Sequence, residues 1–452
     1  MVSELKFGNN NKEIPENKGK HYVLITQKPS SLLYIWFAAN LTIGDFAIGF
    51  IPISLGQPIS PTLVALIIGN ITGGALLGIM STMGVLTRKP QMALSLGPFG
   101  KPGSSVMALL QWGNTLGWLT VNLVLASFAL EIIMKGVYFV IPLLIVAAIV
   151  LLLAYYGHEA IRKFELAMSV ALGILFLFIS IRTVSDFMGG LIYSPAPVLP
   201  TYAGFGITLA ASFSYIMAWG PYASDYSRFV GGKKEASRSF IYAFSGGAIA
   251  SFWIEVLGMA VAIATSNSET NPASALATYM GRYFIFGMVA LFLGGIAANA
   301  LNLYSNGLAL NTAFPRTGRR VPIFLGTAVA IALGIVGYFR FYDFYENFLL
   351  LLDYWITPWL GILIAHYFWL RPKIAGAEIS SKKYSGALAY SLAILISVPF
   401  MYPPAYFAGP IAVMLNGVDI SYYISFFLAV LLYILMNLGT ASSGKRNLIT
   451  PD

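Results

Sequence analysis

A tryptophan and several polar side chains recur at helical spacing in the apolar stretch 111–122, QWGNTLGWLTVN. Asn114, Trp118 and Asn122 are four residues apart and share one face of a helix, with Thr115 beside them. An indole face can stack on a planar ring, which is worth roughly 1–3 kcal/mol for a base on an aromatic side chain. Amides can match donors and acceptors on the ring edge. The alternative is a packing tryptophan whose asparagines bridge helices.

A second amide stripe lies further along the chain. Asn299, Asn302 and Asn306 follow one another at intervals of three and four residues. Amides on a membrane helix are expected to face protein or a cavity. We therefore predict Asn299 and Asn302 as a second set of substrate contacts.

The stretch 215–230, YIMAWGPYASDYSRFV, interrupts an apolar helix at Gly220-Pro221, beside Trp219. Interrupting a helix frees backbone N–H and C=O groups, which hydrocarbon tolerates only around a polar cavity or solute. Glycine and proline can also simply kink a membrane helix. Asp225 and Arg228, three residues apart, are expected to form an ion pair that fixes the end of this helix.

A second interruption is predicted near the chain's beginning, in 32–54 (LLYIWFAANLTIGDFAIGFIPIS), where Asn40, Thr42, Gly44 and Asp45 gather. An aspartate at mid-membrane costs at least about 2.5–3.5 kcal/mol. Asp45 is therefore predicted either to contact the substrate ring or to carry a proton. The structural alternative is a protonated or amide-bonded aspartate that holds the break. Glu255 and Asp353 are weaker candidates for a proton path.

The composition requires a membrane for these helices. The 452 residues are 58% hydrophobic and 10% charged, whereas soluble domains carry about 25% charged residues. The net charge of +9 is explained by basic loops on one side of a membrane, without nucleic acid. The chain has no cysteine, which excludes a disulfide framework and a thiolate metal site.

Long uncharged runs predict twelve membrane spans. Their approximate limits are 32–54, 60–86, 104–134, 137–156, 160–187, 204–229, 238–266, 281–312, 321–338, 345–370, 384–402 and 419–438. With the N-terminus in the cytoplasm, all lysines and arginines fall on the cytoplasmic side except Lys135, Arg182, Arg282 and Arg340. This bias predicts that both termini are cytoplasmic and that the protein lies in the cell membrane.

The spans divide into two halves around the Pro-rich external loop 189–204. We predict an all-α membrane protein with a cytoplasmic tail (1–31, without a cleavable signal), two inverted five-helix repeats (32–187 and 204–370), two extra helices (384–438) and a cytoplasmic tail (439–452). The two interruptions then fall in the first helix of each repeat. Such pairs of broken helices indicate a transporter's binding site at mid-membrane.

The stretch SYIMAWGPYASDYSRFV closely resembles the sixth-helix signature S-Y-x-x-S-W-x-P-Y-x-S-D-Y-S-R-Y of the nucleobase–cation symport-1 family. Ala218 replaces the second serine and Phe229 the last tyrosine. Three further stretches are similar: VALIIGN (64–70), the 111–122 run and ALNLYSNGLAL (300–310). The family comprises permeases for cytosine, purines, uracil, hydantoins, allantoin and thiamine.

The resemblance implies a fold and positions for the site. It implies a bundle of helices 1, 2, 6 and 7 against a scaffold of helices 3, 4, 8 and 9. It places Trp118 at the family's substrate-stacking tryptophan and Asn122 where several members have a glutamine that bonds the ring. Ser214, Tyr215 and Ile216 align with the break that contacts the ring's other side, and the second aromatic wall is either Tyr215 or Trp219.

The resemblance also bears on the coupling ion. Sodium-coupled members hold the ion between carbonyls of helix 1, here near Ala39 and Thr42, and hydroxyls of helix 8. The aligned pair here is Ala297 and Ala298, which offers no side-chain oxygen for a hard cation, although a shifted alignment could recruit Asn299 or Ser305. We therefore favour a proton over sodium, with Asp45 as carrier.

These patterns predict a secondary transporter that imports a nucleobase or related small heterocycle by alternating access, without a cofactor other than a coupling H⁺ or Na⁺. Its partners are a small-molecule substrate and the lipid bilayer, and its oligomeric state stays open. The alternative is an amino-acid or amine permease of the same fold. An enzyme is disfavoured because the three histidines, His21, His158 and His366, lie away from the predicted cavity, and a channel because paired interruptions favour a gated, closed site.

Overall fold

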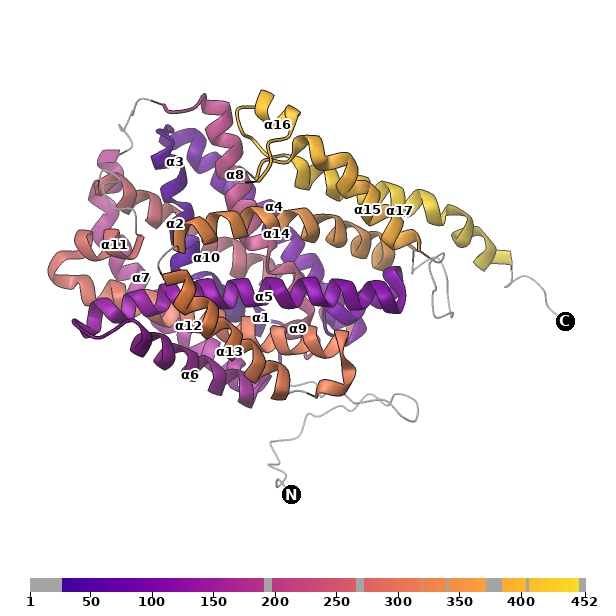
Figure 1. Cartoon of the computed structure of the whole chain (residues 1–452), viewed down its shortest axis with the longest axis horizontal. Helices are drawn as coiled ribbons and strands as arrows, with labels where there is room; N and C mark the ends of the chain where they lie inside the picture. Colours follow the sequence, from indigo (N-terminus) through magenta and orange to yellow (C-terminus); the bar gives the residue numbers. More distant parts are fainter. Residues whose placement is uncertain are drawn as a thin grey trace, which may run out of the picture.

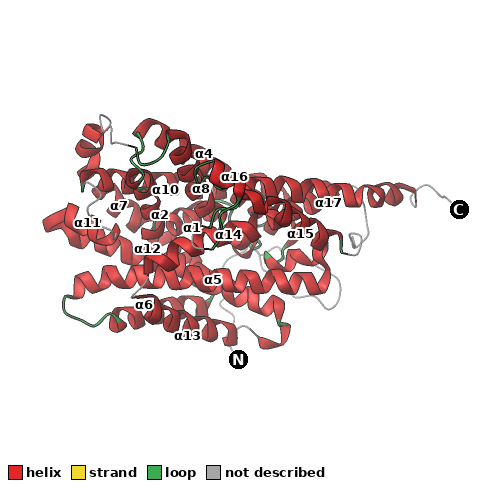
Figure 2. Ribbon diagram, turned by 45° about the horizontal axis from the view of Figure 1, so that its top comes forward, coloured by secondary structure: helices red, strands yellow, loops and turns green. Residues whose placement is uncertain are grey.

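The protein is helical throughout the part that the computed structural model describes, which comprises residues 27–190, 197–265, 272–318, 320–338, 341–370, 384–403 and 406–446 (Figure 2). The β-type pairing recorded in this part is one isolated bridge between Gln27 and Val230. Most of the predicted N-terminal tail, the end of the C-terminal tail and part of the loop 189–204 lie outside the described residues. The basic residues of 371–383 lie outside them as well.

The helices follow the predicted order along the chain. They are α1 (Ser31–Asn40), α2 (Ile43–Ile48), α3 (Phe50–Ser54), α4 (Ile59–Thr87), α5 (Leu96–Met134), α6 (Val140–Tyr156), α7 (His158–Gly190), α8 (Thr201–Met217), α9 (Ala223–Ser227), α10 (Ala236–Ala264), α11 (Pro272–Met280), α12 (Phe284–Ala313), α13 (Arg320–Gly337), α14 (Phe341–Ile364), α15 (Ser385–Ser397), α16 (Pro410–Met414) and α17 (Ser421–Arg446).

Among the described residues, eight helical segments are long and apolar enough to cross a membrane, and the bent unit α1–α3 makes a ninth. The other three predicted spans fall on α14 and on the shorter apolar segments 140–156 and 385–400. The protein is therefore a multi-pass membrane protein.

Two short helical stretches lie outside the predicted spans. The first begins at Leu96, and Gly100 (φ 65°, ψ −178°) separates it from the long helix that forms the third span and contains Pro102, so the predicted start near 104 holds to within a few residues. The short helix α11 precedes the eighth span, in a segment that we did not expect to be helical. Its proline at the first position is favourable there, since that amide has no partner within the helix.

The helices pack in two groups that match the implied bundle and scaffold (Figure 1). In the bundle, α10 packs against α1, α2 and α4, and α4 packs against α8 and α9. In the scaffold, α5, α6, α12 and α13 pack against one another. The C-terminal helices α15 and α17 pack together and against α14, and in both views they extend toward one side of the molecule (Figures 1 and 2).

Glycines allow the bundle helices to approach one another closely. A Cβ atom added to Gly258 of α10 would lie 1.9 Å from the carbonyl oxygen of Phe46, and one added to Gly49 would lie 2.1 Å from the carbonyl oxygen of Glu255. Both distances are far below van der Waals contact, so the backbones of the first and seventh spans touch directly. Small residues have this role between membrane helices, where close packing drives association.

Gln27, the first residue that the structure describes, connects two helices. Its side-chain amide donates to the carbonyl oxygen of Tyr226, and its Oε1 lies 3.2 Å from Nε2 of His158, at the start of α7. The His158 ring stacks on Phe229 with ring centroids 3.9 Å apart. Gln27 therefore connects the beginning of the fifth span to the end of the sixth.

Candidate substrate site

The first span is interrupted as predicted. The helical conformation ends at Asn40, and the axis turns by 55° before the second part of the span. Thr42 is extended (φ −126°, ψ 162°), and its Oγ1 accepts a hydrogen bond from the backbone N–H of Asp45 at 3.3 Å. This is the geometry of an N-cap, in which a short hydroxyl side chain satisfies an unpaired amide at a helix start.

The sixth span is interrupted as well. Helix α8 ends at Met217, a single 3₁₀ turn follows at 220–222, and α9 continues the span from Ala223. Pro221 explains the change in helix type, because it cannot donate to the carbonyl of Met217 four residues earlier. The predicted interruption at Gly220-Pro221 is therefore confirmed, as a change of helix type.

Two side-chain hydrogen bonds join the two interruptions. The hydroxyls of Thr42 and Tyr215 lie 2.5 Å apart, and the indole N–H of Trp219 donates to Oδ1 of Asn40 at 3.0 Å. All four side chains are buried. The first and sixth spans are therefore connected at the level where both depart from regular helix.

These contacts make a coupling between the two spans measurable. We expect Thr42→Val and Tyr215→Phe each to lower the stability of the purified protein by about 1 kcal/mol, the usual value of a buried hydrogen bond. The double variant should cost clearly less than the sum, because both substitutions remove the same bond. Thermal unfolding of the four proteins tests this, and strictly additive losses would show that the hydroxyls do not interact.

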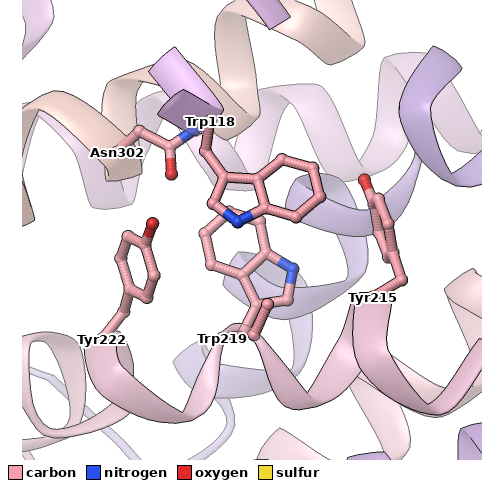
Figure 3. A pocket seen from close by; sticks show the side chains of 6 residues that line it. Trp118, Tyr215, Trp219, Tyr222 and Asn302 are labelled. Atoms are coloured by element: carbon pink, nitrogen blue, oxygen red, sulfur yellow. The ribbon is translucent and has the colours of Figure 1, made fainter. Parts of the chain in front are cut away.

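A pocket lies beside these interruptions, between bundle and scaffold. It is lined by Trp118 of α5, by Asn302 of α12, and by Tyr215, Ala218, Trp219 and Tyr222 of the sixth span. Figure 3 shows the two indoles between the phenol rings of Tyr215 and Tyr222, with the oxygens of Asn302 and Tyr222 directed toward one another. The ring of Trp118 meets Tyr215 edge-on, with centroids 5.4 Å apart.

The pocket wall holds polar atoms without partners. The indole nitrogen of Trp118, Oδ1 of Asn302 and the hydroxyl of Tyr222 are buried, and none reaches a partner within 3.5 Å in the described part of the chain, although Gln111 lies near Tyr222. Buried polar groups are normally paired, so each unpaired atom needs an explanation. A ligand with donors and acceptors on its edge would satisfy all three.

The other predicted polar residues of α5 and α12 connect the two helices. Asn299 donates to the carbonyl oxygen of Leu119 at 3.0 Å and accepts from Asn302 at 3.0 Å. Thr115 accepts a hydrogen bond from Asn306 at 2.8 Å. Asn299 therefore positions the amide of Asn302, while Thr115 lies outside the pocket lining.

Two amides of α5 keep an unpaired oxygen near the site without lining the pocket. Asn114 donates to Oε1 of Gln111 at 2.9 Å, and Asn122 donates to the carbonyl oxygen of Trp118 at 3.1 Å. The Oδ1 atoms of both asparagines are buried and have no partner in the described part of the chain. Their predicted contact with substrate stays a prediction.

Three predicted site residues lie elsewhere. Ser214 donates to the carboxylate of Asp353, which lies on α14. Ile216 packs into a surface of α4 and α10 where a Cβ on Gly73 would lie 2.3 Å from its Cγ2. Asp45 is fully buried on α2 and faces α10 rather than the pocket.

The positions considered for sodium show a close approach of backbones. Ala39, Ala297 and Ala298 are fully buried, and a Cβ on Gly294 of α12 would lie 2.1 Å from the carbonyl oxygen of Leu41. The two alanines supply no hydroxyl at this crossing, so we do not assign Ala39 or Thr42 as metal ligands.

The sequence prediction missed Tyr222 as part of the pocket wall. Its position could have indicated this role: Tyr222 follows Pro221 directly, and the 3₁₀ turn there places its side chain on the same side of the helix as Trp219.

The predicted ion pair of Asp225 and Arg228 was wrong: no such bridge within 4.0 Å exists among the described residues. Asp225 instead accepts the backbone N–H of Gln91 at 2.9 Å.

A multi-pass helical protein whose first and sixth spans are both interrupted beside a closed aromatic pocket has the architecture of a solute transporter, not of an enzyme. The comparison with family models identifies the group. The model described as "Permease for cytosine/purines, uracil, thiamine, allantoin" matches residues 25–425. The chain belongs to this family of permeases, the nucleobase–cation symport-1 family, which confirms the resemblance found in the sequence.

Individual relatives agree with this assignment. The putative purine-cytosine permease YxlA of Bacillus subtilis (strain 168) is 26% identical over 90% of this chain and 92% of its own length. The purine-cytosine permease fcyB of Emericella nidulans is 25% identical over 88% and 83%. Among solved structures, Mhp1, a nucleobase-cation-symport-1 family transporter in a closed conformation with bromovinylhydantoin bound, matches with a TM-score of 0.76, at 20% identity over 92% of this chain and 93% of that one.

Proposed function

We propose that the protein imports a neutral nucleobase or a closely related small heterocycle across the cell membrane, by cation-coupled alternating access. The observation that carries this proposal is the pocket wall: two indoles and two phenols, with an unpaired indole N–H, amide oxygen and hydroxyl among them. Aromatic faces stack on a flat ring, and the unpaired atoms can bond its edge.

The lining favours a neutral substrate over a charged one. None of the six lining side chains is charged. An amino acid, an amine or the cationic thiamine would bring an uncompensated charge into this buried site, which is costly. Cytosine, purines, uracil, hydantoin and allantoin carry no such charge, so they fit the pocket better than the amino-acid or amine alternative does.

Binding requires the pocket to widen. The cavity has a volume of about 10 Å³, which is room for about one water molecule. A heterocycle must therefore separate the surrounding rings, and Tyr215 and Trp219 belong to the interrupted sixth span. We infer that substrate entry shifts this span relative to α5 and α12, as alternating access requires.

A ligand panel tests the proposed substrate class. We expect the thermal unfolding temperature of the purified protein to rise with one or more of cytosine, hypoxanthine, adenine, uracil, hydantoin and allantoin, and to be unchanged by leucine, choline and thiamine. Reconstituted liposomes should show saturable uptake of the same radiolabelled compounds. A shift with leucine or choline alone would favour the amino-acid or amine permease.

The absence of cysteine allows the proposed topology to be tested directly. Val198 and Lys234 are exposed and lie on loops predicted to face opposite sides of the membrane. We expect Val198→Cys to react with a membrane-impermeant maleimide in intact cells, and Lys234→Cys to react only after permeabilisation. The reverse pattern would place both termini outside.

A further inference from the structure

Two buried carboxyl groups face each other inside the helix bundle, apart from the pocket. Asp45 lies on α2 in the first span and Glu255 on α10 in the seventh, and both are fully buried. The two groups interact with one another, and Ser251 of α10 also faces Asp45. Because Gly49 and Gly258 bring the two backbones into contact beside them, the helices leave no room for a large group between the pair.

The carboxyl oxygens are only partly satisfied. Oε2 of Glu255 accepts hydrogen bonds from Nδ2 of Asn70 on α4 and from Oγ of Ser212 on α8, the latter at 3.0 Å. In contrast, Oε1 of Glu255 and both carboxyl oxygens of Asp45 reach no partner within 3.5 Å in the described residues. Three buried oxygens with acceptor capacity therefore lie without a donor.

No cation neutralises the pair within the described part of the chain. The interactions recorded for Asp45 are with Ser251 and Glu255, and those for Glu255 are with Asp45, Asn70 and Ser212. The other elements that pack against α2 and α10, among them α5, α11 and α12, bring no charged side chain to either carboxyl. Two carboxylates that share a buried site cannot both be ionised at low cost, and such pairs retain one proton.

We propose that Asp45 and Glu255 together bind a single proton, and that this carboxyl pair is the coupling-ion site of the transporter. The proton bridges one oxygen of Asp45 and Oε1 of Glu255, which pairs two of the three unpaired oxygens and leaves one net negative charge. It enters from the outer solution with the substrate and leaves to the cytoplasm, one proton per substrate, with no covalent bond made or broken in the substrate. The inference rests on the transport function proposed above.

The pair is connected to the substrate pocket through both interrupted spans. The backbone N–H of Asp45 donates to Thr42, whose hydroxyl contacts Tyr215 in the pocket wall. Ser212, which donates to Glu255, lies one helical turn before Tyr215. Loss of the proton changes the charge between the first, second, sixth and seventh spans, while substrate displaces Tyr215. Both ligands therefore act on the same contacts between the spans.

The test uses full-length protein in liposomes, with radiolabelled cytosine and hypoxanthine as probes. For one proton per neutral substrate, an inward gradient of two pH units sustains up to about hundredfold accumulation, since tenfold corresponds to one unit. We expect Asp45→Asn and Glu255→Gln to lose this accumulation while exchange of labelled for unlabelled substrate stays within about threefold of wild type. Glu165→Gln removes another fully buried carboxyl, on α7, and should accumulate normally.

The outcomes are separable. Absence of any uptake by the wild type would reject the proposed function itself. If Asp45→Asn and Glu255→Gln still accumulate substrate, the carboxyl pair is not the coupling site. The same conclusion follows if Glu165→Gln loses accumulation to the same extent as they do. If a sodium gradient drives accumulation and pH has no effect, the proton is not the coupling ion, whether or not the variants retain accumulation.

A milder variant covers the case in which the neutral substitutions prevent folding. Ser212→Ala keeps both carboxyls but removes one hydrogen bond to Glu255. Since that bond favours the ionised carboxylate, its loss should move the pH of half-maximal uptake upward. An unchanged pH profile in this folded variant would also overturn the proposal.

Discussion

Trp118→Ala is expected to abolish ligand-induced thermal stabilisation by the compounds that stabilise the wild type. The indole supplies one face of the pocket and an unpaired N–H in it. Loss of base–aromatic stacking alone costs roughly 1–3 kcal/mol, which corresponds to about five- to 150-fold weaker affinity. Uptake in liposomes should fall in parallel, because the substrate loses this wall.

Two further variants separate recognition from folding. Trp118→Phe keeps an aromatic face without the N–H and should recover part of the affinity. Trp253→Ala removes a half-buried tryptophan on α10 that donates to Ser180, away from the pocket, and should leave the ligand-induced shift unchanged. A normal shift in Trp118→Ala would exclude stacking on this residue as the basis of recognition.

Gly258→Ala is expected to destabilise the bundle strongly and to abolish transport. Its new Cβ would lie 1.9 Å from the carbonyl oxygen of Phe46, a backbone atom that cannot rotate away. Overpacking of a tight core costs typically about 1–3 kcal/mol and occasionally more. The measurement is the unfolding temperature in detergent, together with uptake in liposomes.

Gly113→Ala on α5 is the matched control. A Cβ at Gly113 meets no atom within 4 Å, and alanine in a helix is favoured over glycine by roughly 0.5–1 kcal/mol. We therefore expect an unchanged or slightly higher unfolding temperature. Equal stability of the Gly258 and Gly113 variants would show that the first and seventh spans are not in direct backbone contact.

Much of this fold followed from local patterns. Uncharged apolar runs fixed the order of the spans, and helical spacing placed Trp118 and the asparagines on shared faces. The break at Thr42 was also predictable, because small polar residues that cap a helix stood in an apolar run. The 3₁₀ turn in the sixth span was less predictable, since Pro221 removes one hydrogen bond but does not by itself decide which helix type replaces it.

The contacts between distant segments were beyond the sequence. Asp45 was recognisable as costly, but nothing local indicates that it faces Glu255, more than two hundred positions away, rather than the substrate. Ser214 was expected to contact the substrate ring and instead contacts Asp353 on α14. Neighbouring residues of one helical turn point in different directions, so Tyr215 faces the pocket while Ser214 faces α14. One sequence defines helix faces; it does not define which neighbour each face meets.

The contacts of Gln27 resist the separation of two helices. Any movement that parts the start of α7 from the end of α9 must first release the Gln27 side chain from Tyr226 and His158. Gln27→Ala would remove both contacts at once and should therefore lower the resistance to such a movement.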